Sequence, residues 1–538
     1  MPQIKGFKSL FEITLDFVAH NMDALSKLTR GDEIYFIPPD VNTPFDKLPS
    51  VILETILYAL QQKDLLKKQH VELLLASHLQ VLDLTGNRLK FDGDGMLDIL
   101  YRAYIRCFEL KILKLPNYEK FQDYVSFFPK FEKLQILVLS RTSTSDKSLE
   151  LIGMSCKHLR ELDITDCSCV TDEGIKALCV VSVAENSVEG KKKGQCKLIE
   201  NLLTKGTRIS NIGIQIAIEN MPALKIFTSA SIQNLAEIHE MDLKNKNFLN
   251  IPKYSLTTLQ LNSSCGSSKC DCLFVRHYES GSLENVVLLY PFLMKVEVNL
   301  TAGFTNNDLL YLKFVERLCE LKINGSCKKS HEDITFNEGV KPLLKAIGPS
   351  LRTLELKDLK TIRIDISILT KLCPNLYSLT LYRNRIYTTS KPEETADSFQ
   401  TKKLKMENPI LKKLSVLQLH CRGDKSEAGF LRLVSSIPEE NLVSLLSLPS
   451  LIDIQIANCC SLTDVVLHQV AKYNNFPKLE VLKLTYCNYV SINAILVFMK
   501  DSNPLHTVSM LDCLLLTREV KEEFKRLVVE KNWMLTVS

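Results

Sequence analysis

The stretch Leu159–Leu178, LRELDITDCSCVTDEGIKAL, decides the fold. Its first six residues follow an L-x-x-L-x-L spacing, and Cys167 comes three residues after the last of them. This spacing predicts a short strand, and the apolar residues Ile175 and Leu178, three apart, predict a helix after it. One strand and one helix cannot bury an apolar face alone, so neighbouring units must stack on them.

The stretch resembles the cysteine-containing form of the leucine-rich repeat, which has one strand and one helix per unit. Similar strand signals begin at Leu79, Leu110, Leu134, Leu159, Leu198, Leu224, Leu256, Leu293, Leu318, Leu351, Leu376, Leu414, Leu451, Leu479 and Leu505. The regular spacings, roughly 24 to 28 residues, suit a strand plus a helix. The sequence therefore predicts an α/β solenoid, a right-handed horseshoe with parallel strands inside and helices outside.

Composition bounds the class of protein. Of 538 residues, 45% are hydrophobic and 24% charged, which is ordinary for a globular protein, and the net charge is only +5. We therefore expect neither a nucleic-acid partner nor a membrane partner. Among the seventeen cysteines, Cys167, Cys459, Cys487 and Cys513 share one place in their repeats. This favours buried thiols over a disulfide framework and predicts a reducing compartment, the cytosol or the nucleus.

The chain is expected to have two parts. Residues 1–75 predict an all-helical cap, with helices over Ser9–Leu25, from Leu48-Pro49 through Leu60, and over Asp64–Ala76. Residues 76–538 predict the repeats, about fifteen units, with insertions near 181–195 and 388–413. An extra helix is expected within Glu427–Leu448, and a closing helix over Thr517–Glu530.

Residues between the strand leucines are expected to point to the concave face. These positions carry both signs of charge, whereas a phosphate-backbone binder would show a single basic stripe. A protein substrate is therefore the predicted partner of this face. The candidate contacts are Glu161, Asp163, Thr165, Glu355, Lys357, Tyr382, Gln418, His420 and Lys483.

No catalytic motif emerges from the sequence, so we expect no enzyme and no cofactor. One loop gathers potential metal ligands: Cys265, Cys270, Cys272 and His277. Its C-x4-C-x-C-x4-H spacing differs from the C-x2-C pairs of the usual zinc sites, so we interpret it as an ordinary loop rather than a metal centre.

The first cap helix carries a candidate adaptor site. Ser9-Leu10-x-x-x-Thr14-x-x-x-Val18 matches the BC-box pattern of elongin-binding proteins, and Leu10, Thr14 and Val18 lie four apart on one helix face. About thirty residues later, Leu48-Pro49-x-x-Ile52-x-x-x-Ile56 matches the cullin box of the type that selects cullin-2.

With the repeats behind it, this cap resembles the zyg-eleven and Zer family of substrate receptors. SLFEITLDFVAHNMDAL, which includes Phe17, carries the resemblance, with Thr14 in place of the family's usual Cys. The armadillo-like half of that family has no counterpart here. The resemblance implies a non-catalytic substrate-recognition subunit of a cullin–RING ubiquitin ligase that binds elongin B and elongin C with cullin-2. Its degron specificity does not carry over.

Two alternatives stay open. From Leu48 to Leu65 the chain also resembles the start of an F-box, which would bind the Skp adaptor and cullin-1, although the V-C-x-x-W ending is missing. The other alternative is a leucine-rich-repeat interaction scaffold unrelated to ubiquitin, in which the N-terminal helices only close the apolar end of the stack.

Overall fold

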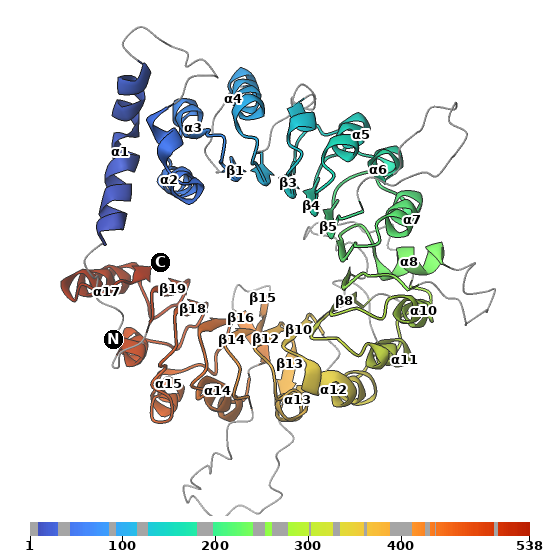
Figure 1. Ribbon diagram of the computed structural model, residues 1–538. Coiled ribbons are helices and arrows are strands. Elements are labelled where there is room, and N and C mark those ends of the chain that lie inside the picture. Colours follow the sequence, from blue (N-terminus) through green and yellow to red (C-terminus); the bar gives the residue numbers. More distant parts are fainter. Residues whose placement is uncertain are drawn as a thin grey trace, which may run out of the picture. The chain divides into compact units, whose positions relative to one another are not determined.

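The chain forms two compact units, Phe7–Leu259 and Gln260–Ser538. The computed structural model (Figure 1) describes residues 9–30, 43–85, 93–115, 127–179, 197–239, 253–260, 278–300, 303–325, 334–359, 363–387, 411–425, 431–435, 437–499 and 504–538. The predicted insertion at 181–195, nearly all of the one at 388–413, and the loop from Cys265 to His277 lie outside these residues.

The first unit begins with the predicted helical cap. Its elements are α1 Leu10–Arg30, η1 Pro44–Lys47, α2 Ser50–Gln62 and α3 Lys68–Leu74. Helix α1 continues five residues beyond its predicted end at Leu25, through Thr29 and Arg30. Pro49 is the N-cap residue of α2, in extended geometry, so the Leu-Pro pair begins this helix as expected.

Six parallel strands follow in sequence order and form one sheet. The strands are β1 Val81–Asp83, β2 Ile112–Lys114, β3 Ile136–Val138, β4 Glu161–Asp163, β5 Asn201–Leu203 and β6 Ile226–Phe227, and β7 Thr258–Gln260 ends at the division between the units. The helices between them are α4 Gly93–Arg106, α5 Asp146–Ser155, α6 Asp172–Cys179, α7 Asn211–Asn220 and α8 Ile232–Ile238.

The strand leucines stack in register. Leu137, Leu162 and Leu202 are paired across β3, β4 and β5, and all three are fully buried. Burying one such side chain stabilises the fold by about 1.5–3 kcal/mol, so each repeat depends on its neighbours. The repeat predicted to begin at Leu198 begins one residue later, because Ile199 is buried in the place of Leu159 whereas Leu198 is exposed.

The second unit repeats the same plan. Its main strands are β8 Lys295–Asn299, β9 Glu320–Asn324, β10 Thr353–Lys357, β12 Ser378–Tyr382, β14 Val416–His420, β17 Asp453–Ala457, β18 Val481–Thr485, β19 Thr507–Leu511 and β20 Thr536–Val537, paired in this order. Its helices are α10 Ser282–Leu289, α11 Asn306–Leu310, η4 Tyr311–Phe314, η5 Phe336–Val340, α12 Lys341–Ile347, η6 Gly348–Ser350, α13 Ile366–Leu372, α14 Glu439–Leu446, α15 Asp464–Val470, α16 Ile492–Leu496, η7 Val497–Met499 and α17 Arg518–Glu530. All fifteen predicted strand signals thus form strands, and α17 is the predicted closing helix.

Five of the described strands were not predicted: β20, which pairs with β19, and two further pairs. Strands β11 Arg363–Asp365 and β13 Arg385–Tyr387 are parallel, and β15 Arg422–Lys425 and β16 Leu431–Ser435 form an antiparallel hairpin. The extra helix expected within Glu427–Leu448 is therefore only α14, from Glu439 onward. Short apolar runs fit a strand as well as a helix, and here Leu431–Ser435 form a strand.

Each sheet has one face covered by helices and one face that we call the open face. The open face carries the first, third and fifth residues of each long strand, because the buried leucines occupy the second and fourth. Figure 1 shows helices along one side of the sheet in each unit. The predicted division of these strands into core residues and residues of the open face is confirmed by this alternation of burial.

The turn after the strand is the same in many repeats. Cys167, Cys459, Cys487 and Cys513 are buried free thiols, as predicted. The residue before the cysteine position has a left-handed backbone in Asp166, Asn458, Tyr486 and Asp512, as do Arg141, Asp358 and Arg383 in other repeats. The Cys167 thiol donates to the Leu139 carbonyl of the preceding repeat at 3.2 Å, which ties adjacent turns together.

Candidate functional site

Helix α1 begins at the serine of the BC-box pattern. The Ser9 backbone N–H and hydroxyl donate to the Glu12 carboxylate at 2.7 and 2.9 Å, and the Glu12 N–H donates back to the Ser9 oxygen at 3.2 Å. This reciprocal capping box satisfies two helix-end donors. Because the cap fixes the first turn, Leu10 is the first residue of the helix and has a defined direction.

The C-terminal half of α1 packs on the rest of the cap. Ala19, Met22 and Ser26, three to four residues apart, are buried there. Deleting a fully buried Met side chain of this kind typically costs about 2–5 kcal/mol. This half of α1 is therefore part of the hydrophobic core.

Polar contacts fix the same half of α1 to α3. The Asp23 carboxylate lies 2.5 Å from Lys67 Nζ, 2.8 Å from Gln69 Nε2 and 2.8 Å from His70 Nε2. The hydrogen bond from Lys67 is the main reason why the pKa of Asp23 is lowered. Burial lowers the pKa of His70, against the opposing effect of Asp23.

The N-terminal half of α1 presents apolar side chains to solvent. Leu10 is 80% exposed and Phe17 is 65% exposed, and Phe11 and Ile13 are also exposed. The Thr14 hydroxyl donates to the Leu10 carbonyl at 2.7 Å, so its polar group is satisfied within the helix. We call these five residues the α1 apolar face; exposed apolar side chains in such a group are typical of interaction sites.

Of the four predicted adaptor contacts on this helix, three lie on the α1 apolar face: Leu10, Thr14 and Phe17. Val18 is half-buried, so it lies between the exposed side of the helix and the side that packs on the cap. Sequence reasoning missed Phe11 and Ile13. Ile13 is three residues from Leu10 and four from Phe17, a helical spacing that could have found it.

The four cullin-box residues are placed differently from one another. Pro49 is exposed, Leu48 and Ile52 are half-buried, and the Leu48 carbonyl oxygen lies 2.6 Å from His78 Nε2. Ile56 is only 3% exposed and lies in the core, so its side chain does not face solvent as a contact residue would.

Two exposed residues of α2 were not predicted. Val51 and Tyr58 are large, exposed and seven residues apart, which places them on one face of the helix. Spacing alone did not separate them from the buried residues of α2, because all are apolar.

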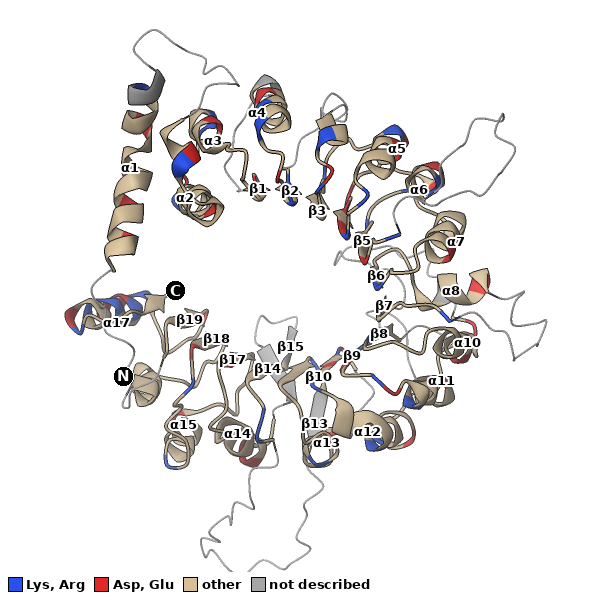
Figure 2. Cartoon of the chain, viewed as in Figure 1, with Lys and Arg blue, Asp and Glu red and all other residues tan. Residues whose placement is uncertain are grey.

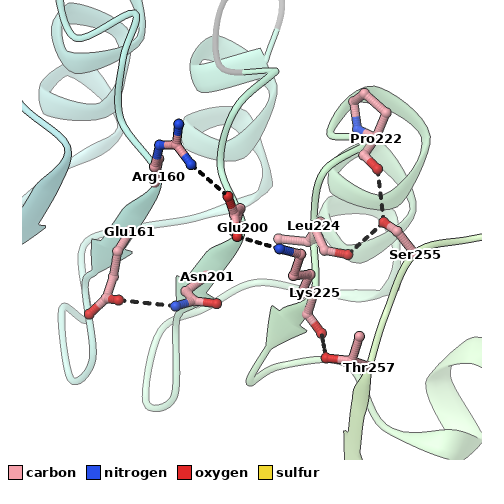
Figure 3. A network of polar contacts seen from close by, with 9 residues as sticks. All are labelled: Arg160, Glu161, Glu200, Asn201, Pro222, Leu224, Lys225, Ser255 and Thr257. Carbon is pink, nitrogen blue, oxygen red and sulfur yellow. Dashed lines mark hydrogen bonds and ion pairs between the residues drawn. The ribbon is translucent and has the colours of Figure 1, made fainter. Parts of the chain in front are cut away.

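The open face of the first unit carries three predicted contacts on and after β4. Glu161 accepts a hydrogen bond from Asn201 Nδ2 on β5 at 3.0 Å (Figure 3), and Asp163 accepts one from the Thr165 N–H at 2.9 Å. All three residues are half-buried, so they remain available to a partner.

Beside this face, a ladder of charges links three repeats (Figure 3). Glu200 lies 3.1 Å from Arg160 and 2.5 Å from Lys225. The hydrogen bond from Lys225 is the main cause of the lowered pKa of Glu200. All three side chains are solvent-accessible, and such pairs contribute little to stability.

The open face of the second unit begins with a charged group on β8, β9 and β10. Lys322 on β9 lies 3.4 Å from Glu320 and 3.7 Å from Glu355 on β10, and Glu355 also pairs with Lys357. Figure 2 shows acidic and basic residues side by side on these strands. Because the signs alternate, this region suits a protein surface better than a phosphate backbone.

Aromatic side chains continue this face on the next strands. The rings of Tyr382 on β12 and His420 on β14 are 4.8 Å apart, and Arg383 lies 4.9 Å from the Tyr382 ring centre. Burial, and then the charge of Lys357, lower the pKa of His420. Gln418 accepts a hydrogen bond from Thr380 at 3.4 Å.

The structure thus brings five predicted contacts together on neighbouring strands: Glu355, Lys357, Tyr382, Gln418 and His420. Lys483 is exposed on β18, separated from β14 by β17. Glu161, Asp163 and Thr165 belong to the other unit.

Within the residues that the structure describes, no group of three His, Cys, Asp or Glu side chains is arranged to hold a metal ion. In the same part of the chain, no helix is long and apolar enough to cross a membrane.

A comparison with protein families supports the repeat architecture. A family model described as Leucine Rich repeat matches residues 155–179. The fold is a leucine-rich-repeat solenoid. No curated protein matches the chain. A chain of the crystal structure of the Rad7 and Elc1 complex in yeast is similar at a TM-score of 0.43 and 14% identity, over 99% of this chain and 98% of that one. A chain of the TLR13–ssRNA13 complex is similar at a TM-score of 0.40 and 15% identity, over 81% of this chain and 50% of that one.

Proposed function

We propose that this protein is a non-catalytic substrate-recognition subunit of a cullin–RING ubiquitin ligase. In this proposal the α1 apolar face binds elongin C, with elongin B, and the repeats hold a protein substrate on their open face. The mechanism is proximity, since holding a substrate beside a ubiquitin-loaded enzyme raises the effective concentration of its lysines. The site of action is then the cytosol or the nucleus.

The observation that carries the proposal is the contrast between the two halves of α1. Its C-terminal half is fixed by buried Met22 and by Asp23, whereas its N-terminal half exposes Leu10 and Phe17. A helix that only closed the stack would turn its large apolar residues inward. An amphipathic helix that presents them outward suits the apolar groove of a partner.

The cap favours an elongin adaptor over Skp for a physical reason. The apolar residues that would form the F-box pattern, Leu53, Ile56, Leu57 and Leu60, are buried inside the cap. Leu10 and Thr14 of the BC-box pattern lie on the exposed α1 apolar face instead. For cullin-2, the exposed Val51 and Tyr58 of α2, together with Pro49, are the contacts that we propose in place of Ile56.

Binding of the purified full-length chain to purified elongin B/C tests the proposal by calorimetry. We expect Leu10→Asp and Phe17→Asp each to weaken binding by at least about 30-fold, since central apolar anchors contribute about 2 kcal/mol or more. Val465→Asp is the matched control, because Val465 is equally apolar and 73% exposed on α15. Unfolding temperatures of all three variants should match the wild type.

Three results would contradict the proposal. If the wild-type protein does not bind elongin B/C or Skp, the interaction scaffold unrelated to ubiquitin is the remaining alternative. Binding to the purified Skp adaptor instead would favour the F-box alternative. Equal loss of elongin binding in Leu10→Asp and Val465→Asp would show that α1 is not the contact.

A further inference from the structure

The four cysteine-type repeats can be compared position by position after their strands. The residues two before the buried cysteine, one before, one after and two after are at least partly exposed, apart from the buried Ala457. The residue that follows them, Val170, Leu462, Val490 or Leu516, is buried again. These four positions are Thr165, Asp166, Ser168 and Cys169 in the first repeat; Ala457, Asn458, Cys460 and Ser461 in the second; Thr485, Tyr486, Asn488 and Tyr489 in the third; and Leu511, Asp512, Leu514 and Leu515 in the fourth.

Only the last two of these repeats place large apolar side chains there. We call Tyr486, Tyr489, Leu511, Leu514 and Leu515 the strand-exit patch. All five are exposed, and Leu514 is 73% exposed. In the two earlier repeats the same positions carry small or polar residues, so the repeat fold itself does not require apolar side chains at these sites.

The patch is continuous across the two repeats. Strands β18 and β19 pair so that Thr485 lies beside Leu511, and the Leu514 N–H donates to Asn488 Oδ1 at 3.2 Å. The hydrogen bond between Tyr486 and Asp512 is the main reason why the pKa of the Tyr486 hydroxyl is raised. These contacts link the two turns, so the patch spans both repeats.

The closing helix does not explain the patch. Helix α17 buries Phe524 and Val528, and Trp533 after it is also buried, so the end of the stack already has a cap. Terminal repeats normally turn a polar surface to solvent. Exposed apolar groups of this size mark places where another molecule binds.

We propose that the strand-exit patch binds a short apolar segment of the protein substrate. This inference rests on the proposed function in taking the repeats to hold a substrate, but its site is separate from α1. Five side chains are far fewer than the 20–30 residues per partner of a standard protein interface, so a peptide-sized segment fits better than a second copy of this chain.

The charge of the patch supports an apolar ligand. None of its five side chains is charged, and the carboxylate of the neighbouring Asp512 is hydrogen-bonded to the Tyr486 hydroxyl. Recognition is therefore by contact with aliphatic and aromatic side chains. Because Leu511 is also the fifth residue of β19, the patch continues the open face of the sheet. A substrate segment can therefore extend from one to the other.

A positional-scanning library of acetylated, amidated nonapeptides tests this on the full-length protein. We expect selection of Leu, Ile, Phe or Met at two or more positions. The best fluorescein-labelled peptide should bind Leu514→Glu at least 10-fold more weakly than wild type in fluorescence anisotropy. Val465→Glu, which carries the same charge at an equally exposed residue of α15, should bind as wild type does.

The outcomes separate this inference from the adaptor proposal. Leu10→Asp should keep peptide binding, and Leu514→Glu should keep elongin B/C binding. The inference is overturned by a library with no apolar preference or by equal loss in Leu514→Glu and Val465→Glu. It is also overturned by sedimentation that shows Leu514-dependent self-association, which would make the patch a contact between copies of the chain.

Discussion

Asp146, at the first position of α5, holds the beginning of the next helix in the stack. Its carboxylate accepts hydrogen bonds from the Thr171 N–H at 2.8 Å and from the Thr171 hydroxyl at 2.7 Å. The same link recurs from Asp172 to Ser210 at 2.7 Å, from Asp464 to Ser491 at 2.8 Å, and from Asn306 to Thr335 at 3.0 Å. The Asp146 carboxylate lies close to the backbone of α6, because a Cβ on Gly174 would be only 2.3 Å from Asp146 Oδ1.

Replacing this residue should therefore weaken the stack. Asp146→Ala leaves two donors of Thr171 without their partner, and we expect a loss of about 1–3 kcal/mol in unfolding free energy. Asp146→Asn should lose less, since the chain itself uses an amide oxygen for this link at Asn306. The urea midpoint of the full chain, followed by circular dichroism, measures both. Equal midpoints for the two variants would contradict the role of the link.

His70 makes the attachment of α1 sensitive to acid. Burial holds the pKa of His70 below its ordinary value. The groups that face its ring are the Asp23 carboxylate, the backbone N–H and side chain of Lys67, and the backbone of Leu65. Because the folded pKa is the lower one, protonation favours the unfolded state. The stability contributed by neutral His70 is present above the ordinary pKa of about 6.5 and is lost as pH falls through the folded value.

We therefore expect the unfolding temperature of the wild type to fall as pH is lowered from about 7 towards 5. In His70→Gln this fall should be smaller, because an amide can still donate to Asp23 but does not titrate. Asp23, whose pKa is also lowered, adds its own loss only at more acidic pH. Differential scanning calorimetry across this pH range measures the unfolding temperature of both proteins. Identical slopes of unfolding temperature against pH would contradict the role given to His70.

At the scale of the element, local spacing predicts strands better than it predicts exposed faces. The L-x-x-L-x-L spacing identified all fifteen predicted strands because the buried apolar residues that make up the spacing lie in or directly before those strands. The one displaced start, at Leu198, arose because Leu198 and Ile199 are both apolar and only packing separates them. Strands β11, β13, β15 and β16 were missed because they form two small sheets outside the repeat pattern, and β20 was missed because it has only two residues.

The candidate sites divide in the same way. Spacing placed Leu10, Thr14 and Phe17 on one helix, but it did not predict which side of that helix the rest of the cap would cover. Ile56 matched a motif and yet is buried, because α2 packs against both α1 and α3. The strand-exit patch had a signal in the sequence, the change from small or polar residues to Tyr and Leu. That signal becomes visible only when the repeats are aligned on their buried cysteines.

At the scale of the whole molecule, the burial of the cysteine thiols indicates how tightly the repeats are stacked. Burial raises the pKa of the thiols of Cys107 and Cys373 to about 12, so almost no reactive thiolate exists at neutral pH. Cys169, beside the buried Cys167, is exposed. A repeat contacts only its neighbours, so a buried thiol becomes reactive only when adjacent repeats separate.

Iodoacetamide labelling of the folded chain, mapped by mass spectrometry, should therefore modify Cys169 before the buried Cys107, Cys167 and Cys373. Cys107, Cys167 and Cys373 should stay unmodified until urea unfolds the unit that contains them, because all three are buried and the reagent cannot reach them before then. The Asp146→Ala variant provides the matched comparison: by loosening the link between α5 and α6 it should expose Cys167 at lower urea than Cys373, which lies in the other unit. Labelling of Cys107 or Cys373 as fast as Cys169 in the native state would show that the stack opens without unfolding.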